Sequence, residues 1–199
     1  MRVLLTGHKG YLGTVMAPVL AAAGHEVVGL DSGLFEDCLL GPAPADPAGF
    51  QVDLRDVTVL KMPDGRLPSH WEEAKNSLEE LRRRTDPDLI LALRTDDAHQ
   101  DHRGLAKLVP TVYRDHLALG YEIVKWDGDL GSPSVYQPLD DEVAEDKVRL
   151  LQEHYASQRH RPWYDREAFL GLARIRGIES SARYAEAFFV KKLQLDLKG

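Results

Sequence analysis

The chain is poor in cysteine, lacks long apolar runs and has fewer basic than acidic residues. Its 199 residues include one cysteine, Cys38, which permits no internal disulfide and is typical of a reducing cytoplasm. The longest mainly apolar stretch, from Tyr11 to Gly24, is too short to cross a bilayer and contains Pro18. The formal net charge of −7 argues against nucleic acid, because phosphate backbones favour basic surfaces. We therefore expect a cytoplasmic protein that acts on small molecules without a nucleic-acid or membrane partner, and self-association stays open.

Strand-like apolar runs alternate with amphipathic helical stretches along the whole chain. We expect strands over 2–6, 26–30, 50–54, 88–93, 121–126 and 187–195. Helices are expected over 11–23, 71–84, 103–116, 140–158 and 165–175, with Pro110 interrupting the third. This alternation predicts an α/β fold: a single Rossmann-like, mainly parallel sheet with helices on both faces, forming one domain over 1–199. In such sheets, ligands bind beyond the carboxyl ends of the strands.

Residues 7–13 read G-H-K-G-Y-L-G, a glycine-rich turn between the first expected strand and a helix. Glycines at these positions allow close backbone approach, and the helix N-terminus favours a pyrophosphate, so NAD is a candidate cofactor. The expected cofactor-binding residues are Gly7, Gly10, Tyr11, Leu12, Gly13, Asp31 (on a ribose hydroxyl), Asp53 and Leu54 (at an adenine pocket). The alternative is that the turn serves only as a tight connection between strand and helix.

With G-H-E-V-V-G-L-D at 24–31 and V-D-L-R-D at 52–56, residues 1–58 resemble the start of the extended short-chain dehydrogenases, the sugar-nucleotide epimerase/dehydratase group. The resemblance implies NAD binding. The family's Tyr-x-x-x-Lys pair has one match, Tyr121 and Lys125, which we expect to be coincidental. Both residues fall in a strand-like segment, where side chains four apart stand too far from one another, and no suitable Ser or Thr precedes them. One functional hypothesis is therefore an NAD(H)-binding module without this catalytic pair.

Residues 96–103 read D-D-A-H-Q-D-H-R and place two imidazoles three residues apart, with a carboxylate between them. If a helix begins near His99, then His99 and His102 share one of its faces. That face can offer one neutral imidazole to a metal and the second to a developing oxyanion. The alternative is a helix N-terminus with solvated His and Asp side chains.

Residues 59–199 resemble another family, the PIG-L or LmbE-like de-N-acetylases. The similarity lies in P-D-G-R-L-P (63–68), P-D-L-I-L (87–91), H-Q-D-H-R (99–103), Y-E-I-V-K-W-D-G-D-L-G (121–131), A-S-Q (156–158) and Y-A-E-A-F (184–188). It implies a hydrolase that removes an acetyl group from an N-acetylated sugar or a related small molecule, usually with zinc. It also implies that His102 binds the metal and that His99 stabilises the oxyanion or protonates the leaving amine. Asp101 would orient this histidine pair.

The H-P-D-D motif with which that family opens is missing here. G-H-K-G-Y stands at the equivalent place, where His8 is a candidate metal ligand but Gly10 and Tyr11 replace both carboxylates. The resemblance therefore predicts an incomplete zinc site and impaired activity. Together the two likenesses give the chain the character of a chimera with its join near 58–62. A folded chimera with neither activity is the remaining hypothesis.

Overall fold

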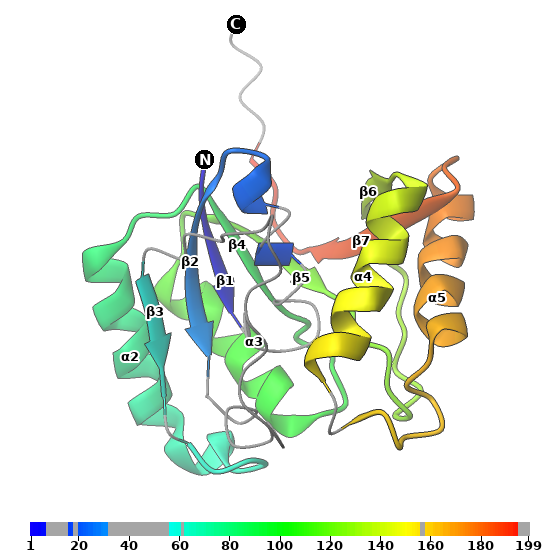
Figure 1. The fold of residues 1–199 in the computed structure, drawn as a ribbon. Coiled ribbons are helices and arrows are strands. Elements are labelled where there is room, and N and C mark those ends of the chain that lie inside the picture. Colours follow the sequence, from blue (N-terminus) through cyan, green and yellow to red (C-terminus); the bar gives the residue numbers. More distant parts are fainter. Residues whose placement is uncertain (7–15, 18–19, 32–55, 61, 156–157, 195–199) are drawn as a thin grey trace, which may run out of the picture.

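The computed structural model describes residues 1–6, 16–17, 20–31, 56–60, 62–155 and 158–194. Within them one seven-stranded sheet has the order β3-β2-β1-β4-β5-β7-β6 (Figure 1). Five strands are parallel neighbours, namely β1 (Arg2–Thr6), β2 (Glu26–Asp31), β3 (Asp56–Val59), β4 (Leu89–Leu93) and β5 (Leu117–Tyr121). β7 (Tyr184–Val190) runs antiparallel to β5, and β6 (Val135–Leu139) antiparallel to β7. The predicted α/β fold with a mainly parallel sheet is confirmed.

The described helices are the short 3-10 helix η2 (Leu67–His70), α2 (Trp71–Arg84), α3 (Gln100–Val112), α4 (Asp141–His154) and α5 (Arg166–Glu179). Residues 16, 17 and 20–22 are also helical. In Figure 1, α2 lies beside β3 at one end of the sheet, and α4 and α5 lie beside β6 and β7 at the other. The segments that resemble two different families therefore contribute strands to the same sheet.

Apolar side chains on both faces of the central strands explain why helices cover both. Leu4, Val28 and Ile90 are at most 4% exposed and pack in one cluster with buried residues of α2 and α3. Their neighbours Val3 and Val27 are fully buried in a second cluster, which includes Ala17. Parallel strands of this composition need cover on both faces, as the sequence predicts.

Several predicted boundaries differ from the structure. The helix expected over 71–84 is observed there, whereas the one expected over 103–116 is α3, which begins at Gln100 and ends two residues after Pro110. The strand expected over 121–126 is wrong: β5 ends at Tyr121, and the next residue, Glu122, turns to a buried ion pair with Arg176 of α5. The closing strand expected over 187–195 lies at 184–190. The strand expected over 50–54 falls outside the described residues.

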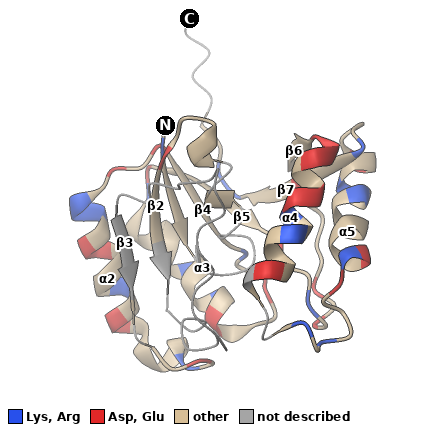
Figure 2. Ribbon diagram, viewed as in Figure 1, with Lys and Arg blue, Asp and Glu red and all other residues tan. Residues whose placement is uncertain are grey.

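Charges of both signs are interspersed on α2, α4 and α5 (Figure 2). Among the described residues, no helix is long and apolar enough to span a membrane.

Candidate functional site

The histidine segment lies at the carboxyl end of β4, between the ends of β1 and β5. β4 pairs in parallel with both of these strands, so the three carboxyl ends meet at one edge of the sheet. From Leu93 the chain turns through residues 94–98 and enters α3 at His99, which is the N-cap residue. The structure thus confirms that a helix begins near His99 at a ligand-binding edge of the fold.

His99 and His102 lie side by side at the start of α3. Their ring centroids are 4.6 Å apart and the ring planes are tilted by 44°. Both side chains are partly exposed, and no described residue hydrogen-bonds Nδ1 of His99, although this atom is buried. The two imidazoles are therefore close enough to act on one bound molecule.

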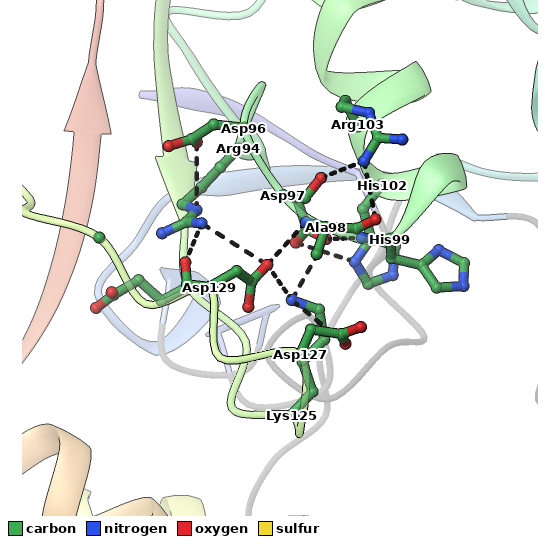
Figure 3. A network of polar contacts seen from close by, with 12 residues as sticks. Arg94, Asp96, Asp97, Ala98, His99, His102, Arg103, Lys125, Asp127 and Asp129 are labelled. Carbon is green, nitrogen blue, oxygen red and sulfur yellow. Dashed lines mark hydrogen bonds and ion pairs between the residues drawn. The ribbon is translucent and has the colours of Figure 1, made fainter.

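Asp97 is the carboxylate that contacts this pair (Figure 3). Its side chain is 3% exposed, and one oxygen lies 3.2 Å from Nδ1 of His102. The other oxygen accepts a hydrogen bond of 2.7 Å from the backbone amide of His99 and lies 3.4 Å from Nζ of Lys125. Burial raises the pKa of Asp97, but His102, the His99 amide and Lys125 together lower it to about 2. Asp97 is therefore ionised at neutral pH and fixes the orientation of His102.

A second carboxylate, Asp129, braces the loop after β5 against the same turn. It accepts a 2.8 Å hydrogen bond from the amide of Ala98 and a hydrogen bond from Lys125. The buried guanidinium of Arg94 donates to the backbone carbonyl of Asp129 (Figure 3). Burial raises the pKa of Asp129, but the Ala98 amide and Lys125 lower it below its usual value. Lys125 thus links both carboxylates and holds this loop beside the histidines.

Asp101 does not take the place that the resemblance implies for it. Its two carboxylate oxygens accept hydrogen bonds from the backbone amides of Gly65 (2.6 Å) and Leu67 (3.0 Å). In the structure, Asp101 therefore fastens the 63–67 turn to α3, and Asp97 supplies the contact to His102. The sequence offered one signal for Asp97, which is the acidic pair of Asp96 and Asp97 shortly before His99. The spacing of these residues does not reveal the turn that points Asp97 back toward His102.

The described residues do not complete a zinc site by themselves. Among them, no three His, Cys, Asp or Glu side chains are grouped so that they could hold a metal. His102 has the setting of a metal ligand, since such histidines usually donate their other ring nitrogen to a carboxylate. A zinc ion nevertheless needs about four ligands, and Asp97 is already engaged by His102 and Lys125. The other candidate ligand, His8, lies outside the described residues.

Most of the expected NAD-binding residues also lie outside the described residues, namely Gly7, Gly10, Tyr11, Leu12, Gly13, Asp53 and Leu54. Asp31 is the last residue of β2, and its backbone pairs with Val59 of β3. The Tyr121 hydroxyl donates to the backbone carbonyl of Thr6 over 2.7 Å, while Lys125 binds Asp97 and Asp129. The lysine lies on a loop rather than on the strand expected for it, and each residue of the pair has a separate partner.

Two family models match the sequence. The GlcNAc-PI de-N-acetylase (PIG-L) model matches residues 45–113, and the NAD dependent epimerase/dehydratase model matches residues 3–64. Both resemblances are thereby confirmed, and the two matched ranges overlap at 45–64. The histidine segment lies in the first range and the glycine turn in the second. No curated protein matches the sequence.

Solved structures of several enzymes share the fold. The N,N′-diacetylchitobiose deacetylase of Pyrococcus horikoshii is 18% identical with a TM-score of 0.65, covering 96% of this chain and 83% of its own. A deacetylase of teicoplanin biosynthesis is 16% identical with a TM-score of 0.60, covering 94% and 96%. The 4-carboxy-2-hydroxymuconate hydratase GalB of Pseudomonas putida is 13% identical with a TM-score of 0.66, covering 98% and 99%. Deacetylases and a hydratase share this architecture, so the fold alone does not select the reaction.

Proposed function

We propose that this protein is an impaired metal-dependent de-N-acetylase that hydrolyses the amide of an N-acetylated sugar or a related small molecule in the cytoplasm. The proposal rests on one observation: two adjacent imidazoles, one oriented by a buried carboxylate, stand at the sheet edge within the segment that the PIG-L model matches.

Amide hydrolysis requires stabilisation of a tetrahedral oxyanion and a proton for the leaving amine. Asp97 engages Nδ1 of His102 and leaves Nε2 as the nitrogen available to a ligand. The partly exposed ring of His99 stands beside it, so we expect His99 to donate to the oxyanion or to the leaving nitrogen. The two histidines thus have distinct roles in the proposed reaction.

The same geometry explains why we expect little activity. A general base works best when its pKa lies near the working pH, and the pKa of Asp97 is lowered to about 2. Asp129 is held by Lys125 and by the Ala98 amide. Asp96, the remaining carboxylate of this turn, is 70% exposed and turned toward Arg94. These three carboxylates are poorly suited to activate water, and Gly10 and Tyr11 replace the two that the family's H-P-D-D motif would supply.

When bound, zinc would lower the pKa of a coordinated water and polarise the amide carbonyl. His102 and His8 are the residues of this chain that we propose as its ligands. Two imidazoles without a carboxylate make a weak site, so occupancy is expected to depend on the zinc concentration.

The test is to measure zinc content and acetate release from N-acetylglucosamine conjugates. We expect weak zinc binding and slow release, both lost in His102→Ala and both retained in His70→Ala, where the histidine lies outside the site. If the protein binds no zinc and releases no acetate even when zinc is in excess, the proposed activity is overturned. A folded, inactive chimera is then the remaining hypothesis.

A second candidate function is NAD binding without dehydrogenase chemistry. It is favoured by the epimerase/dehydratase match over 3–64 and by the parallel pairing of β1, β2 and β3 within that range. NAD at a hundred times its dissociation constant should stabilise the protein by about 2.7 kcal/mol. An unchanged melting temperature at millimolar NAD would dismiss this function.

A further inference from the structure

Trp126 is the most exposed large hydrophobic side chain of the described residues. Its exposed fraction is 66%, whereas Trp71, another exposed tryptophan, is at 37%. Single apolar side chains on a surface usually need no explanation. Trp126 differs from such a residue in how it is held and in what lies beside it.

Two side chains from another loop hold the indole of Trp126 in place. The guanidinium carbon of Arg161 lies over the ring at 5.2 Å from its centroid, and the ring of Trp163 is centred 6.4 Å away. Trp163 in turn makes an edge contact with Tyr164, a buried residue of the core formed by α4 and α5. Although Arg161 and Trp163 both contact the indole, Trp126 remains 66% exposed. An aromatic ring already held in place loses little conformational entropy when a ligand binds.

Trp126 adjoins in sequence a lysine of the histidine site. Its sequence neighbour Lys125 reaches Asp97, with Nζ 3.4 Å from the carboxylate that orients His102. The same loop is fastened again by Asp129, which accepts from the amide of Ala98. Trp126 therefore belongs to a loop tied at two points to the turn that carries the histidines (Figure 3).

We propose that the exposed indole of Trp126, flanked by Arg161, is a subsite that binds a pyranose ring of the substrate. This inference rests on the proposed function, because it names the part of that substrate which lies outside the reacting amide. The C–H face of a pyranose is apolar and complements the electron-rich face of an indole. Asp127 follows Trp126 in the sequence. Its side chain is 37% exposed and can accept hydrogen bonds from sugar hydroxyls. The charged groups beside this small aromatic surface, Arg161 and Asp127, suit the hydroxyls of a sugar better than a broad protein interface.

The experiment measures sugar binding separately from chemistry. The β-1,4-linked disaccharide of N-acetylglucosamine is titrated into the full chain, and binding is followed by saturation-transfer NMR. We expect Trp126→Ala to weaken binding by about three- to tenfold, and Trp126→Phe to stay close to the wild type. Leu130→Ala removes another exposed apolar side chain, 50% exposed, from the same loop and should have no effect.

Equal affinity of Trp126→Ala and the wild type would overturn the subsite, as would a wild type that does not bind the disaccharide. Acetate release is measured on the same samples. Tryptophan-dependent binding without release supports the subsite and overturns the proposed function. Release that is indifferent to Trp126 supports the proposed function and overturns the subsite.

Discussion

Asp97 lies at the centre of the polar contacts that shape the histidine site. It contacts His102 with one oxygen and binds the His99 amide and Lys125 with the other. The sequence identified the two histidines because their spacing places them on one helix face. The family resemblance implied Asp101 as the orienting carboxylate, and the spacing of the sequence does not reveal a contact made by a residue in the turn before the helix. Asp97 reaches His102 only because the chain reverses between Arg94 and His99.

We predict that Asp97→Asn weakens zinc binding and acetate release by about 10- to 100-fold, the usual effect of removing a carboxylate behind a metal-binding histidine. Isothermal titration with zinc and an acetate assay check this. Asp96→Asn is the matched control, because the neighbouring Asp96 is 70% exposed and makes no contact with His102 among its described interactions. Equal effects of the two substitutions would contradict the role of Asp97.

Asp97 also makes stability depend on pH. Its pKa falls from 3.8 to about 2 on folding, so its ionised form stabilises the native state by about 2 kcal/mol. A lowered pKa contributes stability above about pH 4, and this stability is lost as the pH falls toward 2. Urea unfolding of the metal-free proteins measures this effect. The difference in the free energy of unfolding between the wild type and Asp97→Asn should be constant at neutral pH and shrink between about pH 4 and pH 2. A difference that grows on acidification would contradict the assignment.

At the scale of elements, helices and strands with a strong periodic or continuous apolar pattern were predictable, and those with a weak pattern were not. The charged and apolar faces of 71–84 predicted α2 at its observed bounds, and the buried run at 88–93 predicted β4 within one residue. The position of β5 was predicted wrongly, because its sequence L-A-L-G-Y carries small residues and gives a weak strand signal. The apolar and polar residues that alternate after Tyr121 predicted a strand there, but they make loop contacts such as the ion pair between Glu122 and Arg176. β6 escaped notice because V-Y-Q-P-L contains Pro138, which an edge strand tolerates.

The start of α3 offers a test of what Asp101 does. Its carboxylate binds the amides of Gly65 and Leu67, so Asp101→Asn should leave one amide unpaired and cost about 1–3 kcal/mol. We expect a melting temperature lowered by about 2–4 °C per kcal/mol and zinc affinity within about twofold of the wild type. Asp115→Asn, at an exposed acid, is the control for loss of charge. A zinc affinity reduced as far as in Asp97→Asn would show instead that Asp101 orients the histidines.

At the scale of the molecule, the parallel pairing of β1 with β4 joins the two family-like segments in one sheet. Ile90 is fully buried in this sheet and Val28 is 4% exposed. Either Ile90→Asp or Val28→Asp would bury an unpaired charge at a cost of several kcal/mol, against a total stability of about 5–15 kcal/mol. We predict that both variants are insoluble or unfolded by circular dichroism. Ile178→Asp, the same change at a site 63% exposed on α5, should fold normally.

A folded Val28→Asp variant with an unchanged melting temperature would show that the first β-α-β unit is not integrated into the sheet. That outcome would contradict the prediction of a single domain over 1–199. The mainly parallel sheet was predictable from the alternation of strands and helices, whereas the proposal of a chimera rests on the motifs of the chain. Each of the two resembled families begins with a β-α-β unit that has a ligand-binding turn after its first strand. The expected architecture is therefore the same whichever motif occupies that turn.

The most direct test of the account is to restore the missing half of the metal site. Lys9→Pro, Gly10→Asp and Tyr11→Asp together convert H-K-G-Y at 8–11 into H-P-D-D. If the histidine half is intact, the variant should bind about one zinc per chain and release acetate at least about 10²-fold faster than the wild type, and adding His102→Ala should abolish both gains. A variant with wild-type circular dichroism and melting temperature but no gain in zinc or acetate release would contradict the account.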